Sequence, residues 1–212
     1  MYKLIVFDID GTLLDTESAV LKGLQKCLNE HHNIKVNLKD LEFAIGMPGD
    51  EVFSNFGISD NGFSYSKWIK YVDDYKEEIK LFDEIEDTLE YLRKNNVILA
   101  IATSKTRFEY DTTVKHFNIN HYFDYVVCID EVEHPKPSAD SLLKILQQSK
   151  IPAEEALFIG DTYFDIECAR NAQIDFGLAL WGAHEKCKSM CDIHFSTPKE
   201  LCKINILDSV NV

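Results

Sequence analysis

Long hydrophobic runs are absent from this sequence. The first apolar run, from Leu4 to Phe7, stops at Asp8, whereas a membrane-spanning helix needs about 20 apolar residues. The same run is too short for the hydrophobic core of a secretory signal peptide, which takes roughly 7–15 residues. We therefore expect a protein without a membrane segment that stays in the cytoplasm.

Basic side chains are scarce. The chain has 22 Lys and Arg against 36 Asp and Glu, which gives a formal net charge of -14. Binding to nucleic acid or to an anionic membrane depends on clustered Lys and Arg, so neither is an expected partner. A small soluble substrate is expected instead, although an acidic protein that binds other proteins would have the same charge balance.

Cysteines are few, and their spacing does not indicate a disulfide framework. They occur at Cys27, Cys128, Cys168, Cys187, Cys191 and Cys202. Scattered cysteines in a chain without a secretory signal are typical of reduced thiols in the cytoplasm.

A compact group near the end of the chain consists of zinc-ligand residue types. It contains His184, Cys187, Cys191 and His194. Its spacing matches no common zinc-site pattern, and His194 with Phe195 is typical of a final strand. The sequence leaves open whether His184, Cys187 and Cys191 bind a metal.

Short apolar segments alternate with amphipathic stretches along most of the 212 residues, of which 45% are hydrophobic. The segments expected to be buried strands are 4–7, 97–102, 125–129, 156–159 and 176–180. The stretches expected to be helices are 85–95, 107–117, 139–149 and 164–172. In the first helix, Ile85, Leu89 and Leu92 form one apolar stripe. Apolar strands separated by helices indicate a parallel sheet that is covered on both faces, so the predicted fold class is α/β, a doubly wound (Rossmann-like) sheet.

The segment after the first strand interrupts this alternation. Residues 15–82 contain helical signals at 18–30 and 65–79 and turn signals at 46–49 and 60–62. We predict an α/β core domain formed by residues 1–14 and 83–212, and an inserted all-α-helical cap domain of residues 15–82. Trp68, Tyr71 and Tyr75, at helical spacing, are expected to pack within the insertion.

Polar side chains follow four of the predicted strands at the point where each strand ends. They are Asp8 and Asp10 after the first strand, Thr103 and Ser104 after the second, Lys136 after the third, and Asp161 and Asp165 after the fourth. Ligands bind outside the carboxyl ends of the strands in an open parallel sheet. We therefore expect these groups to converge at one edge of the sheet.

Each of these groups also has a purely structural explanation. Asp-Gly is a common turn signal, Thr103 and Ser104 are good helix caps, and one acidic residue of a strand-to-helix junction often caps the helix while another stabilises its first turn. Two carboxylates at the end of a buried strand, Asp8 and Asp10, nevertheless repel each other and lose hydration unless a cation neutralises them. Oxygen ligands of this kind suit Mg²⁺, which also bridges phosphate oxygens.

In this order the residues resemble the motifs of the haloacid dehalogenase superfamily. The matching pieces are Asp8-Ile9-Asp10-Gly11-Thr12, then Ser104, then Lys136, then Gly160-Asp161-Thr162-Tyr163-Phe164-Asp165. The resemblance covers nearly the whole chain and is nearest to the branch of phosphoglycolate phosphatase and beta-phosphoglucomutase. The helical insertion is similar to the small cap domain of that branch.

The resemblance implies a catalytic role for five residues. Asp8 is implied to attack phosphorus and become an aspartyl-phosphate, and Asp10 to protonate the leaving oxygen and then to activate water. Ser104 or Thr103 is implied to bind the phosphoryl group, whose charge Lys136 balances.

The resemblance also implies a magnesium site. Its ligands would be Asp8, the backbone carbonyl of Asp10, and Asp161, with Asp165 supporting the ion directly or through water. This set implies a magnesium-dependent phosphatase, similar to phosphoglycolate phosphatase, that hydrolyses a small phosphorylated metabolite.

Three other functions remain open on the same scaffold. A phosphomutase would return the phosphoryl group to its sugar, and a haloacid dehalogenase would need neither a metal nor an acid at Asp10. A catalytically silent binding protein would lack a catalytic group, and none is missing.

Relatives in this branch often carry a basic residue before the Gly-x-Pro turn of the cap, but residues 42–48 contain none, so the substrate stays open. The expected state is a monomer or homodimer.

Overall fold

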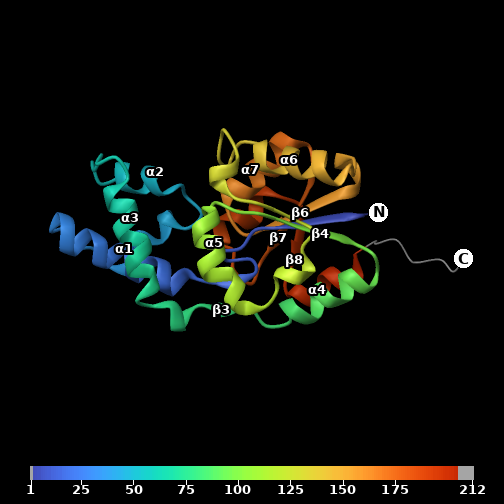
Figure 1. Ribbon diagram of the computed structural model, residues 1–212, viewed down its shortest axis with the longest axis horizontal. Coiled ribbons are helices and arrows are strands. Elements are labelled where there is room, and N and C mark those ends of the chain that lie inside the picture. Colours follow the sequence, from blue (N-terminus) through green and yellow to red (C-terminus); the bar gives the residue numbers. More distant parts are fainter. Residues whose placement is uncertain (1, 205–212) are drawn as a thin grey trace, which may run out of the picture. The chain divides into compact units, whose positions relative to one another are not determined.

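The computed structural model describes residues 2–204, without the side chain of Asp50. These residues divide into two compact units (Figure 1). Residues 2–13 and 81–204 form the first, here called the α/β unit, and Leu14–Lys80 form the second, the helical unit. The first boundary between the units lies between residues 13 and 14, one residue before the predicted boundary between 14 and 15. The second lies between residues 80 and 81, two residues before the predicted boundary between 82 and 83.

The α/β unit contains a six-stranded parallel sheet with the order β5-β4-β1-β6-β7-β8. Its strands are β1 (Leu4–Phe7), β4 (Ile98–Ala102), β5 (Tyr125–Val127), β6 (Ala156–Gly160), β7 (Asp175–Ala179) and β8 (Ile193–Phe195). The predicted doubly wound parallel sheet is thus confirmed. Strand order runs from β1 to β5 on one side and from β6 to β8 on the other, so the direction of winding switches beside β1, where such folds bind ligands.

Helices cover both faces of this sheet. They are α4 (Ile85–Lys94), α5 (Arg107–Thr113), α6 (Asp140–Ser149) and α7 (Tyr163–Ala172). Helices α6 and α7 lie on one face and α4 on the other (Figure 1), where α4 contacts η8 (Pro198–Lys203). The remaining short 3-10 helices of this unit are η3 (Val114–Phe117), η4 (Asn120–Tyr122), η5 (Ile129–Glu131), η6 (Ala153–Glu155) and η7 (Glu185–Met190).

One predicted helix, 107–117, is α-helical only as far as Thr113 and then tightens into η3. Thr112, Thr113 and Val114 are consecutive β-branched residues, which lose side-chain freedom in a helix. In addition, the Thr112 hydroxyl donates back to the carbonyl of Phe108. Both effects weaken the α-helix at this point.

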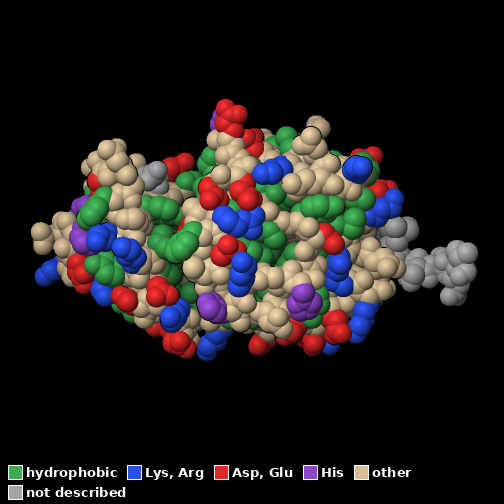
Figure 2. All heavy atoms as spheres, in the orientation of Figure 1, with side chains coloured by type: hydrophobic (Ala, Val, Ile, Leu, Met, Phe, Trp, Pro, Cys, Tyr) green, Lys and Arg blue, Asp and Glu red, His purple; other side chains and the backbone are tan. Residues whose placement is uncertain are grey.

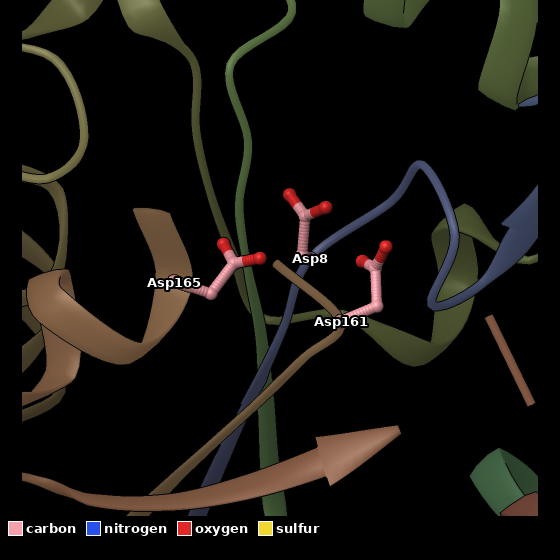
Figure 3. A group of neighbouring side chains, drawn as sticks. All are labelled: Asp8, Asp161 and Asp165. Carbon is pink, nitrogen blue, oxygen red and sulfur yellow. The ribbon is translucent and has the colours of Figure 1, made fainter. Parts of the chain in front are cut away.

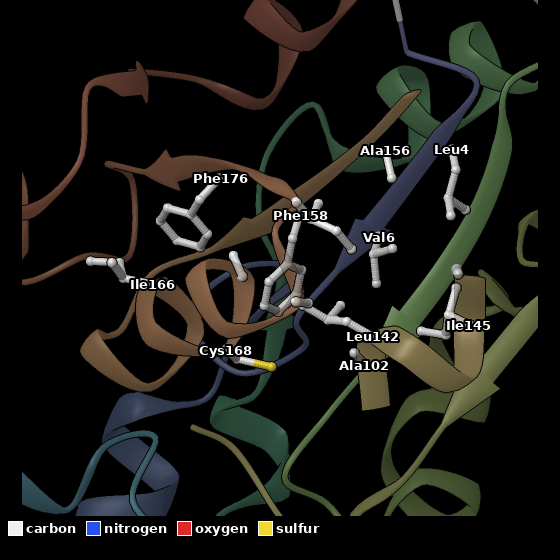
Figure 4. Close-up of a cluster of buried hydrophobic side chains, with 14 of the residues drawn as sticks. Leu4, Val6, Ala102, Leu142, Ile145, Ala156, Phe158, Ile166, Cys168 and Phe176 are labelled. Carbon is white, nitrogen blue, oxygen red and sulfur yellow. The ribbon is translucent and has the colours of Figure 1, made fainter. Parts of the chain in front are cut away.

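A hydrophobic core fills the space between the sheet and helices α6 and α7 (Figure 4). Leu4 and Val6 of β1 and Phe158 of β6 are fully buried. The side chains that they meet from the helices include Leu142, Ile145, Ile166 and Cys168. On the other face, Ile85, Leu89 and Leu92 of α4 are buried as their spacing predicted. A sheet buried on both faces explains why its strands are continuously apolar.

The helical unit consists of α1 (Glu17–His32), η1 (Leu38–Ala44), α2 (Gly49–Ser54), α3 (Phe63–Asp73) and η2 (Lys76–Glu78). The chain passes into and out of this region through two short paired strands, β2 (Leu14–Asp15) and β3 (Lys80–Leu81), so the expectation of a purely helical insertion is wrong in this detail. Trp68 is buried in the core of the unit and Tyr71 packs against it, as predicted, whereas Tyr75 lies beside Lys22.

Charged side chains of both signs are interspersed over the face of the molecule in Figure 2. No helix within residues 2–204 has the length and apolar character needed to cross a membrane.

Candidate active site

The site begins where β1 ends. The Asp8 backbone N–H donates to the carbonyl of Ile159, at 2.9 Å, and so extends the pairing of β1 with β6 by one residue. This pairing fixes the backbone of Asp8 beside the end of β6, the strand that leads to Asp161. Asp8 is only 6% exposed.

Three carboxyl groups converge at this edge of the sheet, as Figure 3 shows. Carboxylate oxygens of Asp8, Asp161 and Asp165 all lie within 4.8 Å of one another. Asp161 and Asp165 are at most 1% exposed, so water cannot screen their mutual repulsion. Like charges at such a distance repel one another and destabilise the site unless a cation is present.

Lys136 supplies one positive charge to this group. Its Nζ donates to Asp8 Oδ1 and to Asp165 Oδ1, both at 2.7 Å, and the lysine is 5% exposed. Burial lowers the pKa of Lys136, but the charges of Asp165 and Asp8 outweigh burial and raise it, so the ammonium stays charged. One lysine for three carboxyl groups still leaves a negative excess.

Asp165 has both of its oxygens occupied by protein donors. Oδ1 accepts from Lys136, and Oδ2 accepts from the backbone N–H and the hydroxyl of Thr162, at 3.1 and 2.6 Å. Thr162 is the N-cap of α7 and forms a capping box with Asp165. The idea that Asp161 or Asp165 caps this helix is therefore wrong, because the hydroxyl between them does so.

Asp161 has one oxygen without a protein partner. Oδ1 accepts from the Thr12 hydroxyl at 3.0 Å, whereas Oδ2 is buried and has no hydrogen-bond donor among the described residues. Burial, followed by the charges of Asp165 and Asp8, raises the pKa of Asp161 well above its ordinary range. A buried carboxylate oxygen without a donor is costly, and a hard divalent cation is the ligand that suits it.

Gly11 leaves the space for this oxygen. A Cβ at position 11 would lie 2.1 Å from Asp161 Oδ2, and the residue has a φ of +78°, which favours glycine. The Asp-Gly dipeptide is therefore a turn, as its sequence indicates, and it also permits the close approach of the carboxylate.

Asp8 itself has a pKa raised to about 7 from the ordinary 3.8. Burial is the largest cause, and the charge of Lys136 opposes it. A carboxylate must be ionised to act as a nucleophile or as a metal ligand, so a second cation beside Asp8 would favour its reactive form. The donor set of Asp8 and Asp161, with Asp165 close by, fits a divalent metal ion.

The Asp10 carboxylate is not part of this group. Its Oδ1 lies 2.9 Å from Lys105 Nζ, and the two side chains are 25% and 13% exposed. The pKa of Lys105 is raised because the charge of Asp10 and its neighbours outweighs burial. Lys105 was not among the predicted site residues, although it directly follows Ser104.

Thr103 and Ser104 lie at the end of β4 and do not cap the next helix. Thr106 is the N-cap of α5, in a capping box with Glu109. Thr103 is 3% exposed, and its Oγ1 accepts the backbone N–H of Lys105 at 3.1 Å. The cap explanation for this pair is therefore wrong.

Within residues 2–204, the potential metal-binding group found is the aspartate set around Asp8. His184, Cys187 and Cys191 do not come together as such a group. Cys187 lies in the 3-10 helix η7, Cys191 follows its end, and both are free thiols. The structure thus separates the residue types that the sequence places close together.

Comparison with known proteins gives the family. Residues 5–179, which include Asp8, Lys136, Asp161 and Asp165, match the family described as haloacid dehalogenase-like hydrolase. The chain belongs to this family. It is a haloacid dehalogenase-like hydrolase, and the sequence resemblance is confirmed.

One relative and two solved structures are similar to this chain. A protein named "Putative pyrophosphatase PpaX" from Caldanaerobacter subterraneus is 30% identical over 185 residues, covering 84% of this chain and 81% of that protein. The crystal structure of a "Putative haloacid dehalogenase-like hydrolase" from Bacteroides fragilis has a TM-score of 0.86 at 26% identity, covering 95% of this chain and all of that one. A "putative phosphoglycolate phosphatase" from Lactobacillus plantarum has a TM-score of 0.89 at 24% identity, covering 96% and 99% of the two chains, and shows the shared fold.

Proposed function

We propose that this haloacid dehalogenase-like hydrolase is a magnesium-dependent phosphatase that works through an aspartyl-phosphate on Asp8. The observation that carries the proposal is the buried Asp161 Oδ2, which has no donor among the described residues and lies within the carboxylate group beside Asp8. Asp8, Asp161 and the backbone carbonyl of Asp10 would hold the ion, with Asp165 supporting it. When bound, Mg²⁺ would neutralise the carboxylates and the negative charge of the phosphoryl group.

The first half of the reaction forms the phospho-enzyme. A carboxylate oxygen of Asp8 attacks phosphorus, the new P–O bond forms, and the bond to the leaving oxygen breaks. Asp10 gives its proton to the leaving oxygen. Ser104 or Thr103 and Lys136 hold the transferring group in line, and the ammonium of Lys136 favours the ionised form of Asp8 against the opposing effect of burial.

The second half regenerates Asp8. Asp10, now ionised, accepts a proton from a water molecule that attacks the phosphorus of the aspartyl-phosphate. The bond between phosphorus and Asp8 breaks, and inorganic phosphate leaves. The ammonium of Lys105 lies 2.9 Å from Asp10 Oδ1 and orients this carboxyl group for the step.

The substrate class has two candidates. The resemblance to phosphoglycolate phosphatase favours a small phosphate monoester. The 30% identical relative is named as a pyrophosphatase, which favours inorganic pyrophosphate, whose leaving group is phosphate itself. Both reactions use the same attack by Asp8, so they differ only in how the leaving group is recognised.

The test is hydrolysis of p-nitrophenyl phosphate and of pyrophosphate with and without Mg²⁺. Asp8→Asn should lower either activity about a thousandfold or more, because the nucleophile is removed. Asp175→Asn is the matched control, since Asp175 bonds Tyr2 at the start of β7, and it should retain activity. Labelled phosphate should be trapped on Asp8. No turnover across a broad phosphate panel would refute the phosphatase, and label returned to a sugar phosphate would establish a mutase.

We also propose that the helical unit acts as a cap and that the protein is cytoplasmic. The chain enters the helical unit at Leu14, six residues after Asp8, and access of water must be controlled in both half-reactions. Small-angle scattering should show a smaller radius of gyration with Mg²⁺ and vanadate than without them. The cytoplasmic location is supported by six free cysteines, and cell fractionation tests it.

A further inference from the structure

The loop that follows β7 packs against the turn that follows β1. Trp181 donates its indole Nε1–H to the backbone carbonyl of Thr12 at 2.8 Å. The next residue, Gly182, approaches so closely that an added Cβ would lie 1.8 Å from the carbonyl oxygen of Gly11. Trp181 and Gly182 thus pack against the two neighbouring peptide groups of Thr12 and Gly11.

Both partners in this contact are well anchored. The turn after β1 is closed by the N–H groups of Thr12 and Leu13, which donate to the carbonyl of Ile9 at 3.2 and 2.9 Å. The loop after β7 is closed by the N–H groups of Gly182 and Ala183, which donate to the carbonyl of Ala179 at 3.1 and 3.0 Å. The indole therefore joins two tight turns at the carboxyl ends of parallel strands.

The same Thr12 also makes the bond that orients Asp161. Thr12 is fully buried, and its hydroxyl donates to Asp161 Oδ1 at 3.0 Å. With Oδ1 held, the rotation of the carboxyl group is fixed, and Oδ2 is the oxygen left without a donor among residues 2–204. A chain of two hydrogen bonds thus runs from Trp181 through Thr12 to the carboxyl group that presents this oxygen.

We propose that Trp181 is a positioning residue for the divalent-cation site. Its indole N–H fixes the Thr12 peptide, and the Thr12 hydroxyl then aims Asp161 Oδ2 at the ion. Trp181 touches neither the ion nor the substrate. The inference rests on the proposed metal site, and it assigns that site an outer partner from the loop after β7. Outer partners of metal ligands typically alter affinity by about 10–100-fold.

The experiment measures binding of Mg²⁺ or Mn²⁺ alone to the substrate-free protein by calorimetry. Trp181→Phe keeps the aromatic ring but removes the donor, and the dissociation constant should rise about tenfold. Trp68→Phe is the matched control, because the Trp68 indole also donates to a backbone carbonyl, that of Val20 at 2.9 Å, within the helical unit. Its dissociation constant should stay within about twofold of the wild-type value, since the lost bond is not connected to the site.

A double-mutant cycle tests the route through Thr12. Thr12→Val should weaken binding at least as much as Trp181→Phe, and Thr12→Ser, which restores the hydroxyl, should bring the affinity back. In the Thr12→Val background, adding Trp181→Phe should cost little more, because both changes break the same chain. Additive losses would overturn the proposed route, and so would an unchanged affinity in Trp181→Phe.

A spectroscopic measurement covers the case in which Trp181→Phe fails to fold. The chain has two tryptophans, and the Trp68→Phe variant assigns their two indole N–H signals by NMR. The Trp181 signal should move on Mg²⁺ saturation of Trp68→Phe, and Thr12→Val should abolish the movement. An unmoved signal in a protein that binds the ion overturns the inference alone, whereas a wild type that binds no divalent ion refutes the proposed metal site itself.

Discussion

Lys136→Met is the substitution that most directly tests the charge balance of the site. The ammonium of Lys136 is the shared donor of Asp8 and Asp165, with both N···O distances 2.7 Å and all three side chains at most 9% exposed. Methionine has nearly the same length and no charge. The substitution therefore removes the cation and leaves three buried carboxyl groups without compensation.

The size of the effect follows from this burial. Removing one partner of a buried ion pair costs about 3–5 kcal/mol, because the remaining charge is left uncompensated. For a chain of this length, each kcal/mol lowers the melting temperature by roughly 2–4 °C. In EDTA at pH 8, Lys136→Met should therefore melt about 6–20 °C below the wild type. Saturating Mg²⁺ should recover part of this loss, since it supplies positive charge to the same carboxylates.

The assay is thermal unfolding followed by circular dichroism, in EDTA and then in Mg²⁺. Lys105→Met is the matched control: it also removes an ammonium from the site, but Lys105 pairs with one carboxylate, Asp10, whose side chain is 25% exposed, whereas Lys136 pairs with two that are at most 9% exposed. The melting temperature of this control should fall by less than half as much. Equal shifts in the two variants, or a Lys136→Met protein that melts within about 2 °C of the wild type, would refute the reasoning.

Two further predictions concern the metal-free protein. Asp161→Asn should raise the free energy of unfolding by about 1–3 kcal/mol, because a neutral amide replaces a buried carboxylate that lacks a donor. The same substitution should abolish stabilisation by Mg²⁺. A melting temperature in EDTA below that of the wild type would contradict this prediction. The pKa of Asp8, raised to about 7 from 3.8 mainly by burial, makes the protonated form the stable one in the fold. The stability that Asp8 contributes is thus complete below about pH 4 and is lost as pH rises through 7, by up to about 4 kcal/mol. Urea unfolding in EDTA should show this fall in the wild type and a smaller one in Asp8→Asn.

Much of the fold could be predicted because its signals are local. The apolar run of β1 ends at an aspartate, and the stripe of Ile85, Leu89 and Leu92 has helical spacing, so each element is visible within a few residues. The pair β2 and β3 could not be found in this way. Each has two residues, which is too short for any periodicity to appear.

The site was predictable in its residue types and less so in its contacts. Strand ends indicate where side chains gather, and this brought Asp8, Lys136 and Asp161 into one group. The bond from Thr12 to Asp161 joins residues 149 positions apart, and no pattern around either residue indicates it. Lys105 was missed for a similar reason, since its partner Asp10 belongs to another strand end. Such pairings depend on strand order, which the residues near each strand do not encode.

The central position of β1 also has a consequence for synthesis of the protein. Leu4 leaves the ribosome before its partners Ile98 and Ala156, which follow about 5–30 s later at elongation rates of about 5–20 residues per second. During that time the whole helical unit, Leu14–Lys80, has been synthesised and can begin to fold. The nascent segment meanwhile exposes four consecutive apolar residues, bounded by Lys3 and Asp8. Charges at the ends of an apolar segment oppose aggregation. The carboxylate of Asp8, the proposed nucleophile, would thus also oppose aggregation during translation.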